Sequence, residues 1–130
     1  KNKAFGKEDY IDSIVLEELK KHDIELINVN QGYAKCSCAV CDSGVITADD
    51  SIFKALRENG INSLKIAPGH VKLTGYDYGF IGGASGVIDG NLTFFGDVSK
   101  HPDFSKIKDF CDFDYFGNFV LSDIGTIFCI

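Results

Sequence analysis

The sequence predicts a mixed α/β domain that carries two tandem strand–strand–helix–strand units. Short apolar runs of strand length alternate with amphipathic segments of helix length, and turn residues separate them in an order that occurs twice. The chain has 130 residues, of which 45% are hydrophobic, and this is enough for one packed core. We therefore expect residues 1–130 to form a single domain.

The segment 7–32 is expected to form a helix followed by a strand. Its apolar residues recur at the spacing of one helix face: Ile11, Ile14, Val15 and Leu19. Residues 24–29 then form an apolar run of strand length, which ends in turn residues before Gly32. We interpret this segment as the trailing helix and strand of one unit.

Residues 33–69 are expected to form the first full unit. Residues 34–40 have the small and β-branched content of a strand, and a turn at Gly44 leads to a second strand. The acidic pair at 49–50 then caps a short amphipathic helix. Residues 61–66 return as the third strand of the unit.

Residues 79–125 repeat this order and are expected to form the second full unit. A hairpin turn at 89–91 leads to an apolar strand, Asp97 corresponds to the acidic cap of the first unit, and a helix begins near Pro102. Residues 126–130 are interpreted as the leading strand of a further unit. Five aromatic residues of the second unit are expected to belong to the core: Phe110, Phe113, Tyr115, Phe116 and Phe119.

Composition limits the partners that this chain is expected to bind. The formal net charge is −6 and Arg57 is the single arginine, so the chain lacks the basic surface that nucleic acid requires. No apolar run approaches the roughly 18–20 residues that cross a membrane, and no signal-peptide pattern is seen. The five cysteines are odd in number and are expected to be reduced, which indicates the cytoplasm. The chain begins at Lys1 and has no methionine, so we expect its natural start to lie elsewhere.

Three motifs resemble those of one protein family. They are PGH at residues 68–70, GYDYGFIGGASG at residues 75–86 and GDVSKHP at residues 96–102. From about Gly32 onward, the chain resembles an uncharacterised family of the guanidine-modifying superfamily, which contains arginine deiminases, dimethylarginine hydrolases and amidinotransferases. The resemblance implies a pentein fold, a β/α propeller of ββαβ units, of which this chain would form about half.

The resemblance also implies a set of site residues. In catalytic members, a cysteine in the final short strand attacks the guanidinium carbon. Residues 125–130, GTIFCI, are similar to that strand, with Cys129 at the matching place. The histidine of those members would fall near residues 79–82, which read GFIG and contain none. His70 is the nearest substitute in the sequence, and Asp77 is a candidate to orient it or to hold a cation.

Simpler interpretations of these residues remain open. Cys129 has the apolar neighbours of a buried core cysteine, and His70 follows Pro-Gly as a turn residue does. The cluster Cys36, Cys38 and Cys41 lacks the paired spacing of a zinc site, and no loop has the spacing of an EF-hand. We therefore expect no metal and no cofactor.

Two functions of different classes are compatible with the sequence. The first is an active or degenerate cysteine-dependent hydrolase or amidinotransferase that acts on a small guanidino or amidino compound, and Cys129 favours it. The second is a non-catalytic binding or assembly module on the same fold, and the missing histidine favours that. Half a propeller would leave edge strands unpaired, so we expect a homo-oligomer or association with a missing N-terminal half.

Overall fold

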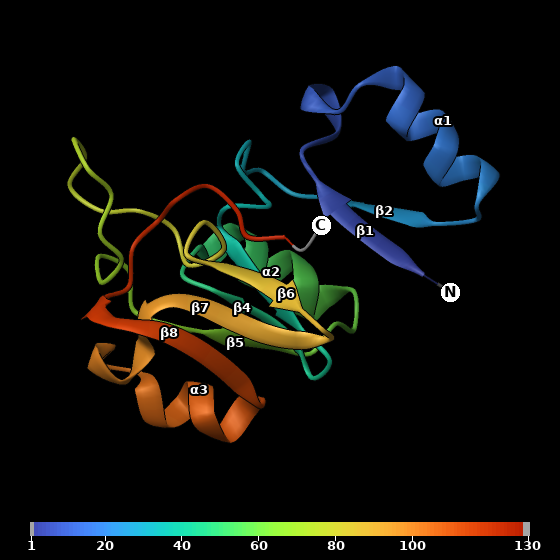
Figure 1. Cartoon of the computed structure of the whole chain (residues 1–130). Helices are drawn as coiled ribbons and strands as arrows, with labels where there is room; N and C mark the ends of the chain where they lie inside the picture. The colour runs from blue at the N-terminus through green and yellow to red at the C-terminus, as the bar shows by residue number, and fades with distance from the viewer. Residues whose placement is uncertain (1, 129–130) are drawn as a thin grey trace.

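The computed structural model describes residues 2–128 and shows a mixed α/β protein with three small sheets (Figure 1). This confirms the predicted fold class at its coarse level, and the described residues form no closed ring of sheets. The strands are β1 (Lys3–Gly6), β2 (Glu25–Asn28), β3 (Cys38–Cys41), β4 (Gly44–Thr47), β5 (Ser63–Lys65), β6 (Ser85–Ile88), β7 (Asn91–Asp97) and β8 (Phe113–Val120). The helices are α1 (Ser13–Lys21), α2 (Asp50–Glu58), α3 (Phe104–Phe110) and two short 3-10 turns, η1 (Glu8–Tyr10) and η2 (Val98–Lys100).

Two of the sheets have the same strand order and the same strand directions. In the first, β4 lies between antiparallel β3 and parallel β5, and α2 connects β4 to β5. In the second, β7 lies between antiparallel β6 and parallel β8, and α3 follows β7 on the way to β8. Each sheet with its helix therefore has the order strand, strand, helix, strand.

The segment from β1 to β2 has the parallel strand pair and connecting helix of such a unit. The sequence predicts α1 and β2 but does not predict β1. Residues 3–6 read KAFG and contain a single large apolar side chain, so their pattern is too short and too weak to indicate a strand. The strand is defined instead by its register with β2, in which Lys3 lies opposite Glu25.

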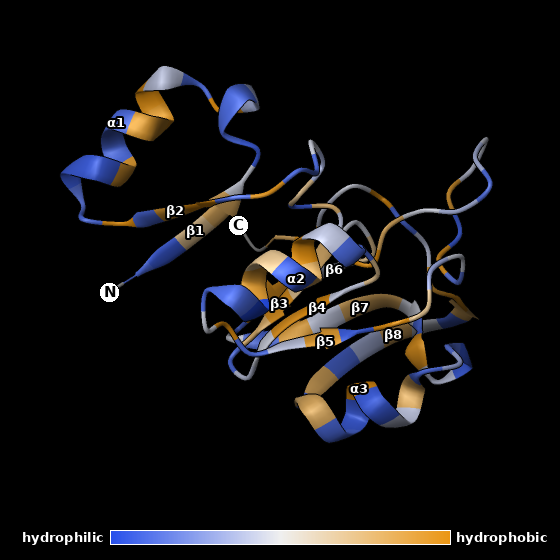
Figure 2. Cartoon of the chain, turned by 180° about the vertical axis from the view of Figure 1, so that it is seen from behind, coloured by the Kyte–Doolittle hydropathy of each residue, from blue (hydrophilic) through white to orange (hydrophobic). Residues whose placement is uncertain are grey.

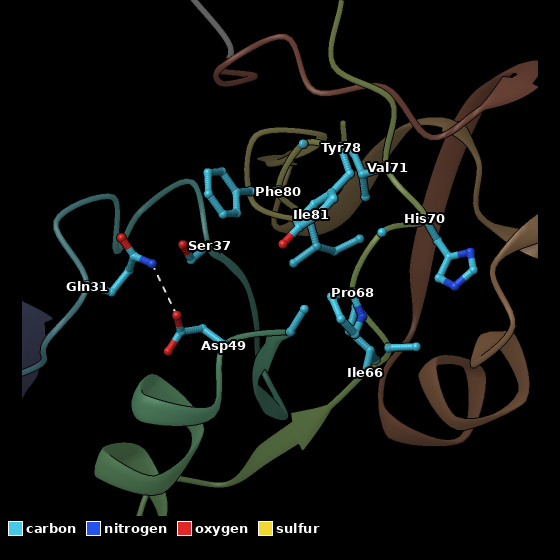
Figure 3. A pocket seen from close by; sticks show the side chains of 14 residues that line it. Gln31, Ser37, Asp49, Ile66, Pro68, His70, Val71, Tyr78, Phe80 and Ile81 are labelled. Carbon is cyan, nitrogen blue, oxygen red and sulfur yellow. Dashed lines mark hydrogen bonds between the residues drawn. The ribbon is translucent and has the colours of Figure 1, made fainter. Parts of the chain in front are cut away.

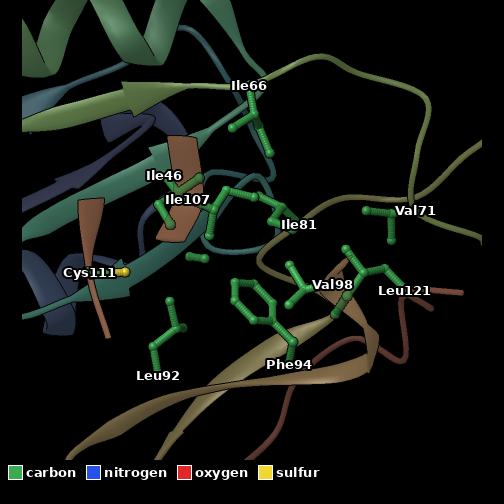
Figure 4. Close-up of a cluster of buried hydrophobic side chains, with 12 residues drawn as sticks. Ile46, Ile66, Val71, Ile81, Leu92, Phe94, Val98, Ile107, Cys111 and Leu121 are labelled. Carbon is green, nitrogen blue, oxygen red and sulfur yellow. The ribbon is translucent and has the colours of Figure 1, made fainter. Parts of the chain in front are cut away.

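Two clusters of buried apolar side chains hold these units together. The larger cluster joins the two three-stranded sheets to α3 and includes Ile46, Phe94 and Ile107, all fully buried (Figure 4). The smaller cluster joins β2 to α2 and includes Ile27 and Leu56. Because α2 contacts β2 and α3 contacts β5, each of these helices packs against the last strand of the preceding unit.

The predicted strand at residues 34–40 is wrong in its first half. Residues 32–37 form turns, and β3 begins only at Cys38. Hydrogen bonds between backbone groups close these turns, and Cys36 O accepts a further one from Gly83 N at 3.0 Å. Local composition did not reveal the turn because the partner that fixes it lies far along the chain.

Apolar side chains of α1 and β8 lie on the surface. No residue of α1 is buried, and Ile14 is 69% exposed, although the helix carries three of the four predicted apolar residues (Figure 2). The fourth, Ile11, lies before the helix begins. On β8, which is an edge strand, Tyr115, Phe116 and Phe119 are exposed. The expectation that these three side chains belong to the core is therefore wrong, because no further strand pairs with β8 among residues 2–128. The remaining two aromatic residues pack against the core: Phe110 and Phe113.

Thr47, the last residue of β4, connects the turn at residues 32–37 to the start of α2. Its side chain is fully buried, and Oγ1 donates to Ser37 O at 2.8 Å and accepts from Asp49 N at 3.1 Å. Asp49 in turn caps α2, because its carboxylate accepts from Ile52 N at 2.9 Å. One hydroxyl thus satisfies two backbone groups and fixes the distance between the turn and the helix.

Replacing Thr47 with valine is expected to destabilise the fold by roughly 1–3 kcal/mol, because valine keeps the shape but leaves Ser37 O and Asp49 N without their partner. Urea unfolding followed by circular dichroism measures this loss. Thr93→Val is the matched control, since Thr93 is also buried but its hydroxyl makes one longer hydrogen bond, to Asn91 O at 3.3 Å. Equal losses in the two variants would contradict the role of Thr47.

Candidate functional site

Three loops gather at the same end of the two three-stranded sheets (Figure 1). The loops are residues 30–37, residues 66–84 and residues 121–128. Gly83 connects all three, because it belongs to the second loop, its N–H donates to Cys36 O in the first, and its O accepts from Ile124 N in the third, each at 3.0 Å. Side chains that are far apart in the sequence therefore meet here.

The glycine-rich run of the second loop lies against Asp123. A Cβ atom at Gly83 would overlap the Asp123 side chain, and a Cβ atom at Gly82 would overlap backbone oxygens of the first loop. Asp123 accepts hydrogen bonds from Phe80 N and Gly125 N, both at 2.9 Å. The glycines are thus required by the close approach of three segments of backbone.

The first hollow between these loops has a volume of about 600 Å³, and we name it the aromatic hollow. Four rings and two carboxylates line it: Tyr33, Tyr76, Tyr78, Phe80, Asp77 and Asp123. The rings of Tyr33 and Phe80 are stacked, with centroids 6.4 Å apart and planes inclined by 23°. Tyr76 is 75% exposed, so the hollow is open to solvent. Aromatic faces beside carboxylates favour a cationic ligand.

The second hollow brings together two residues predicted from the sequence, His70 and Asp77. Both line a cleft of about 360 Å³, which we name the histidine cleft, and Asp97, Lys100 and His101 also line it. The rings of His70 and His101 meet edge to face, with centroids 5.3 Å apart. Asp77 lies between the two hollows, because it lines both.

His101 is the residue of this cleft that sequence reasoning missed as a site residue. It is 4% exposed, and its Nδ1 accepts a hydrogen bond from Asp103 N at 3.0 Å. Burial, followed by the nearby His70, lowers the pKa of His101, so the ring is neutral near pH 7. Its proton therefore resides on Nε2. No local sequence signal shows that His70 and His101 meet.

The third hollow has a volume of about 280 Å³, and we name it the serine hollow (Figure 3). Its polar wall is formed by Gln31, Ser37 and Asp49, and its remaining wall is largely apolar. Gln31 Nε2 donates to Asp49 Oδ2 at 3.1 Å. Burial opposes ionisation of Asp49, but hydrogen bonds from Ser51, Ile52 and Gln31 outweigh it and lower the pKa of the carboxyl group. The sequence indicated Asp49 only as a helix cap.

Cys129, the candidate nucleophile, lies outside the described residues. The chain that leads to it is held at Gly125, whose O accepts from Lys35 Nζ at 3.1 Å. Ile127 then forms an isolated parallel bridge with Gly86. The described part of the third loop therefore runs beside the glycine-rich run.

The four cysteines that the structure describes lie in different environments. Cys36, Cys38, Cys41 and Cys111 are free thiols. Cys36 lines the aromatic hollow, whereas Cys38 is buried, and burial raises the pKa of Cys38 to about 12. Within residues 2–128, no three His, Cys, Asp or Glu side chains come together as a metal ion would require.

The fold and the hollows define a mixed α/β protein whose loop end offers cavities of small-molecule size. The sequence profile of a family of unknown function, DUF6873, matches residues 1–128, and the chain belongs to that family. No curated protein and no solved structure matches the chain. Among the residues that the structure describes, no helix has the length and apolar character needed to cross a membrane.

Lowering the pH from about 7 to about 5 is expected to destabilise the protein through His101. Its pKa is lowered in the folded state and has its ordinary value of about 6.5 in the unfolded state, so below that pH the unfolded state binds the proton more readily. Protonation would also remove the acceptor for Asp103 N.

Urea unfolding at both pH values measures this effect. His101→Asn is expected to reduce the pH dependence, whereas His22→Asn, at an exposed position on the C-terminal end of α1, is expected to preserve it. A pH dependence that is the same in His101→Asn as in the wild type would show that another group is responsible.

Proposed function

We propose that this chain binds a small guanidino or amidino cation in the aromatic hollow and belongs to a protein of the guanidine-modifying type. The observation that carries this proposal is the composition of the hollow, in which Asp77 and Asp123 are the charged side chains of the lining and four aromatic rings surround them. A planar cation would stack on a ring face and donate to a carboxylate at its edge.

Each aromatic face adds a modest amount to the free energy of cation binding. A cation over an aromatic face contributes about 0.5–2 kcal/mol, depending on how far it is removed from water. The stacked rings of Tyr33 and Phe80 and the exposed ring of Tyr76 offer such faces. The net charge of −6 adds a general attraction for cations.

Cys129 is the proposed nucleophile, because residues 125–130 resemble the nucleophile strand of the guanidine-modifying superfamily. Its thiolate would form a bond to the central carbon of the bound group, and the bond from that carbon to the leaving amine would then break, with a proton passing to the amine nitrogen. Water or another amine would subsequently release the carbon from sulfur. His70, which lines the adjoining histidine cleft, is the proposed proton donor and acceptor.

The arrangement of the units supports a pentein-type propeller as the proposed architecture. Both full units have the same strand order, and α2 and α3 make the same kind of contact, each with the last strand of the unit before it. A relationship that repeats from one unit to the next is what rotation about a propeller axis produces.

Alkylation of Cys129 tests the proposed function. We expect iodoacetamide at neutral pH to label Cys129 several-fold faster than Cys111, because burial, with Cys41 beside it, raises the pKa of Cys111. Methylguanidine is expected to slow labelling of Cys129. Peptide mass analysis of the labelled chain reports both rates.

Two aspartate variants distinguish binding in the aromatic hollow from a general effect of negative charge. Asp77→Asn is expected to abolish protection by methylguanidine, whereas Asp109→Asn, which removes the same charge from an exposed position on α3, is expected to retain it. Labelling of Cys129 that is as slow as that of Cys111, or that methylguanidine leaves unchanged, would contradict the proposal.

A non-catalytic assembly module is the second candidate function, and the surface of β8 favours it. Tyr115 and Phe116 are exposed on this edge strand, which presents unpaired backbone groups beside apolar side chains. We expect light scattering at high concentration to show a dimer or larger species, and Tyr115→Lys to weaken it. A species of 14.2 kDa at every concentration would rule out self-assembly.

A further inference from the structure

Cys41 and Cys111 belong to different units of the repeat but meet at one place in the fold. Cys41 is the last residue of β3, and Cys111 directly follows α3. Both line a small hollow of about 140 Å³, which we name the cysteine hollow. The turns of the two hairpins form most of its remaining wall. Because β3 begins after the first loop and ends at Cys41, this hollow lies at the end of the sheets opposite the three loops.

The alternation of side chains along β3 places Cys41 on the same side as Cys111. Successive side chains of a strand point to opposite faces of the sheet, so Cys41 shares a face with Ala39 and not with Cys38. Ala39 and Cys111 belong to the larger cluster of buried side chains, and Cys41 packs against that cluster. Cys38 belongs to the smaller cluster instead. Figure 4 shows Cys111 at the edge of the larger cluster.

The end of α3 packs closely against the first hairpin. A Cβ atom at Gly44, the first residue of β4, would lie 3.1 Å from the ring of Phe110. Phe110 immediately precedes Cys111, and the N–H of Cys111 donates to Ile107 O at 3.2 Å. The backbone on both sides of the cysteine hollow is therefore held in place by regular hydrogen bonds and by packing, and Cys41 and Cys111 are fixed as neighbours.

The two thiols differ in how readily a reagent can reach them. Cys41 is half-buried, whereas Cys111 is buried. Burial, followed by the neighbouring Cys41, raises the pKa of Cys111 to about 12, so Cys111 is a poor first nucleophile at neutral pH. Modification of Cys41 would remove its contribution to this raised pKa. A small reagent is therefore expected to react first with Cys41, while Cys111 lies beside it as the second thiol.

The charges around the cysteine hollow favour a cationic reagent. Asp42 and Asp112 are the charged side chains of its lining, and both are exposed. Two carboxylates beside the thiols attract a cation and repel an anion. The volume of about 140 Å³ limits the reagent to a short chain.

We propose that Cys41 and Cys111 are a site of oxidative modification, at which a small cationic disulfide such as cystamine converts the two thiols into a disulfide. The Cys41 sulfur attacks one sulfur of cystamine, the S–S bond of cystamine breaks, and the first cysteamine leaves as a thiol with the proton of Cys41. The Cys111 sulfur then attacks the Cys41 sulfur of the mixed disulfide, and the second cysteamine leaves with the proton of Cys111. The protein thiols are oxidised and cystamine is reduced. This site does not depend on the proposed function, because it uses neither Cys129 nor Asp77.

Peptide mass analysis of the full, reduced chain tests the proposal after incubation with cystamine at neutral pH and quenching with acid. We expect a linked pair of peptides that contain Cys41 and Cys111, with the loss of two hydrogen atoms. Three results would each overturn the proposal: no reaction at Cys41, a persistent cysteamine adduct on Cys41 with Cys111 still free, or linkage of Cys41 to another cysteine.

Two cysteine variants separate the two steps of the exchange. Cys111→Ala keeps a small apolar side chain and is expected to stop at the mixed disulfide between Cys41 and cysteamine. Cys41→Ser is expected to leave Cys111 unmodified, because Cys111 is buried. Cystamine is expected to raise the unfolding temperature of the wild type by several degrees, because a cross-link restricts the unfolded chain, and to produce no such rise in Cys111→Ala. An equal rise in Cys111→Ala would refute the cross-link.

Three small disulfides of different charge test the role of the carboxylates. We expect the cross-link to form several-fold faster with cystamine than with the uncharged hydroxyethyl disulfide, and most slowly with the anionic dithiodiglycolate. Asp112→Asn is expected to reduce the preference for cystamine, whereas Asp9→Asn, at an exposed position on η1, is expected to retain it. Equal rates for the three reagents would refute the assignment of a cationic disulfide to this site.

Discussion

The contact between Asp123 and the glycine-rich run is the constraint on which the loop end of the molecule depends. Asp123 accepts one backbone hydrogen bond from the second loop, at Phe80, and one from its own loop, at Gly125. Gly83 has no side chain, and a Cβ atom at this position would overlap Asp123. The two loops can therefore approach closely. The position of Phe80, and with it the stacked pair that forms the aromatic hollow, follows from this contact.

The three hollows are not independent, because the second loop contributes to all of them. Tyr78 and Phe80 line both the aromatic hollow and the serine hollow. His70 lines the serine hollow and the histidine cleft, and Asp77 lines the histidine cleft and the aromatic hollow. A ligand that moves this loop would therefore alter the walls of the neighbouring hollows as well.

The parts of the fold that depend on local pattern could be predicted from the sequence. Turn residues, acidic caps and strand-length apolar runs indicated the order of elements in both full units, and Asp49 caps α2 as its position suggested. The turn at residues 32–37 could not be predicted in this way, because Gly83 fixes it from a distant part of the chain. The exposure of Phe116 could not be predicted either, since an aromatic run has the same pattern at an edge as in a core.

The residues of the candidate site also divide into those that the sequence indicated and those that only the structure revealed. His70 and Asp77 were indicated by their motifs, and they line one cleft. His101 was hidden, since its neutral state depends on burial and on a ring from another loop.

The packing of each helix on the preceding unit has a consequence for how stability is distributed. α2 and α3 bury Leu56 and Ile107 partly against strands that belong to the unit before them, so neither full unit completes its own core. Stability then resides at the junctions between units, as in a linear array of coupled repeats, and damage at one junction weakens both of its neighbours. Ile14 on α1 has no such junction among the described residues and remains exposed, which makes this helix the natural place for unravelling to begin.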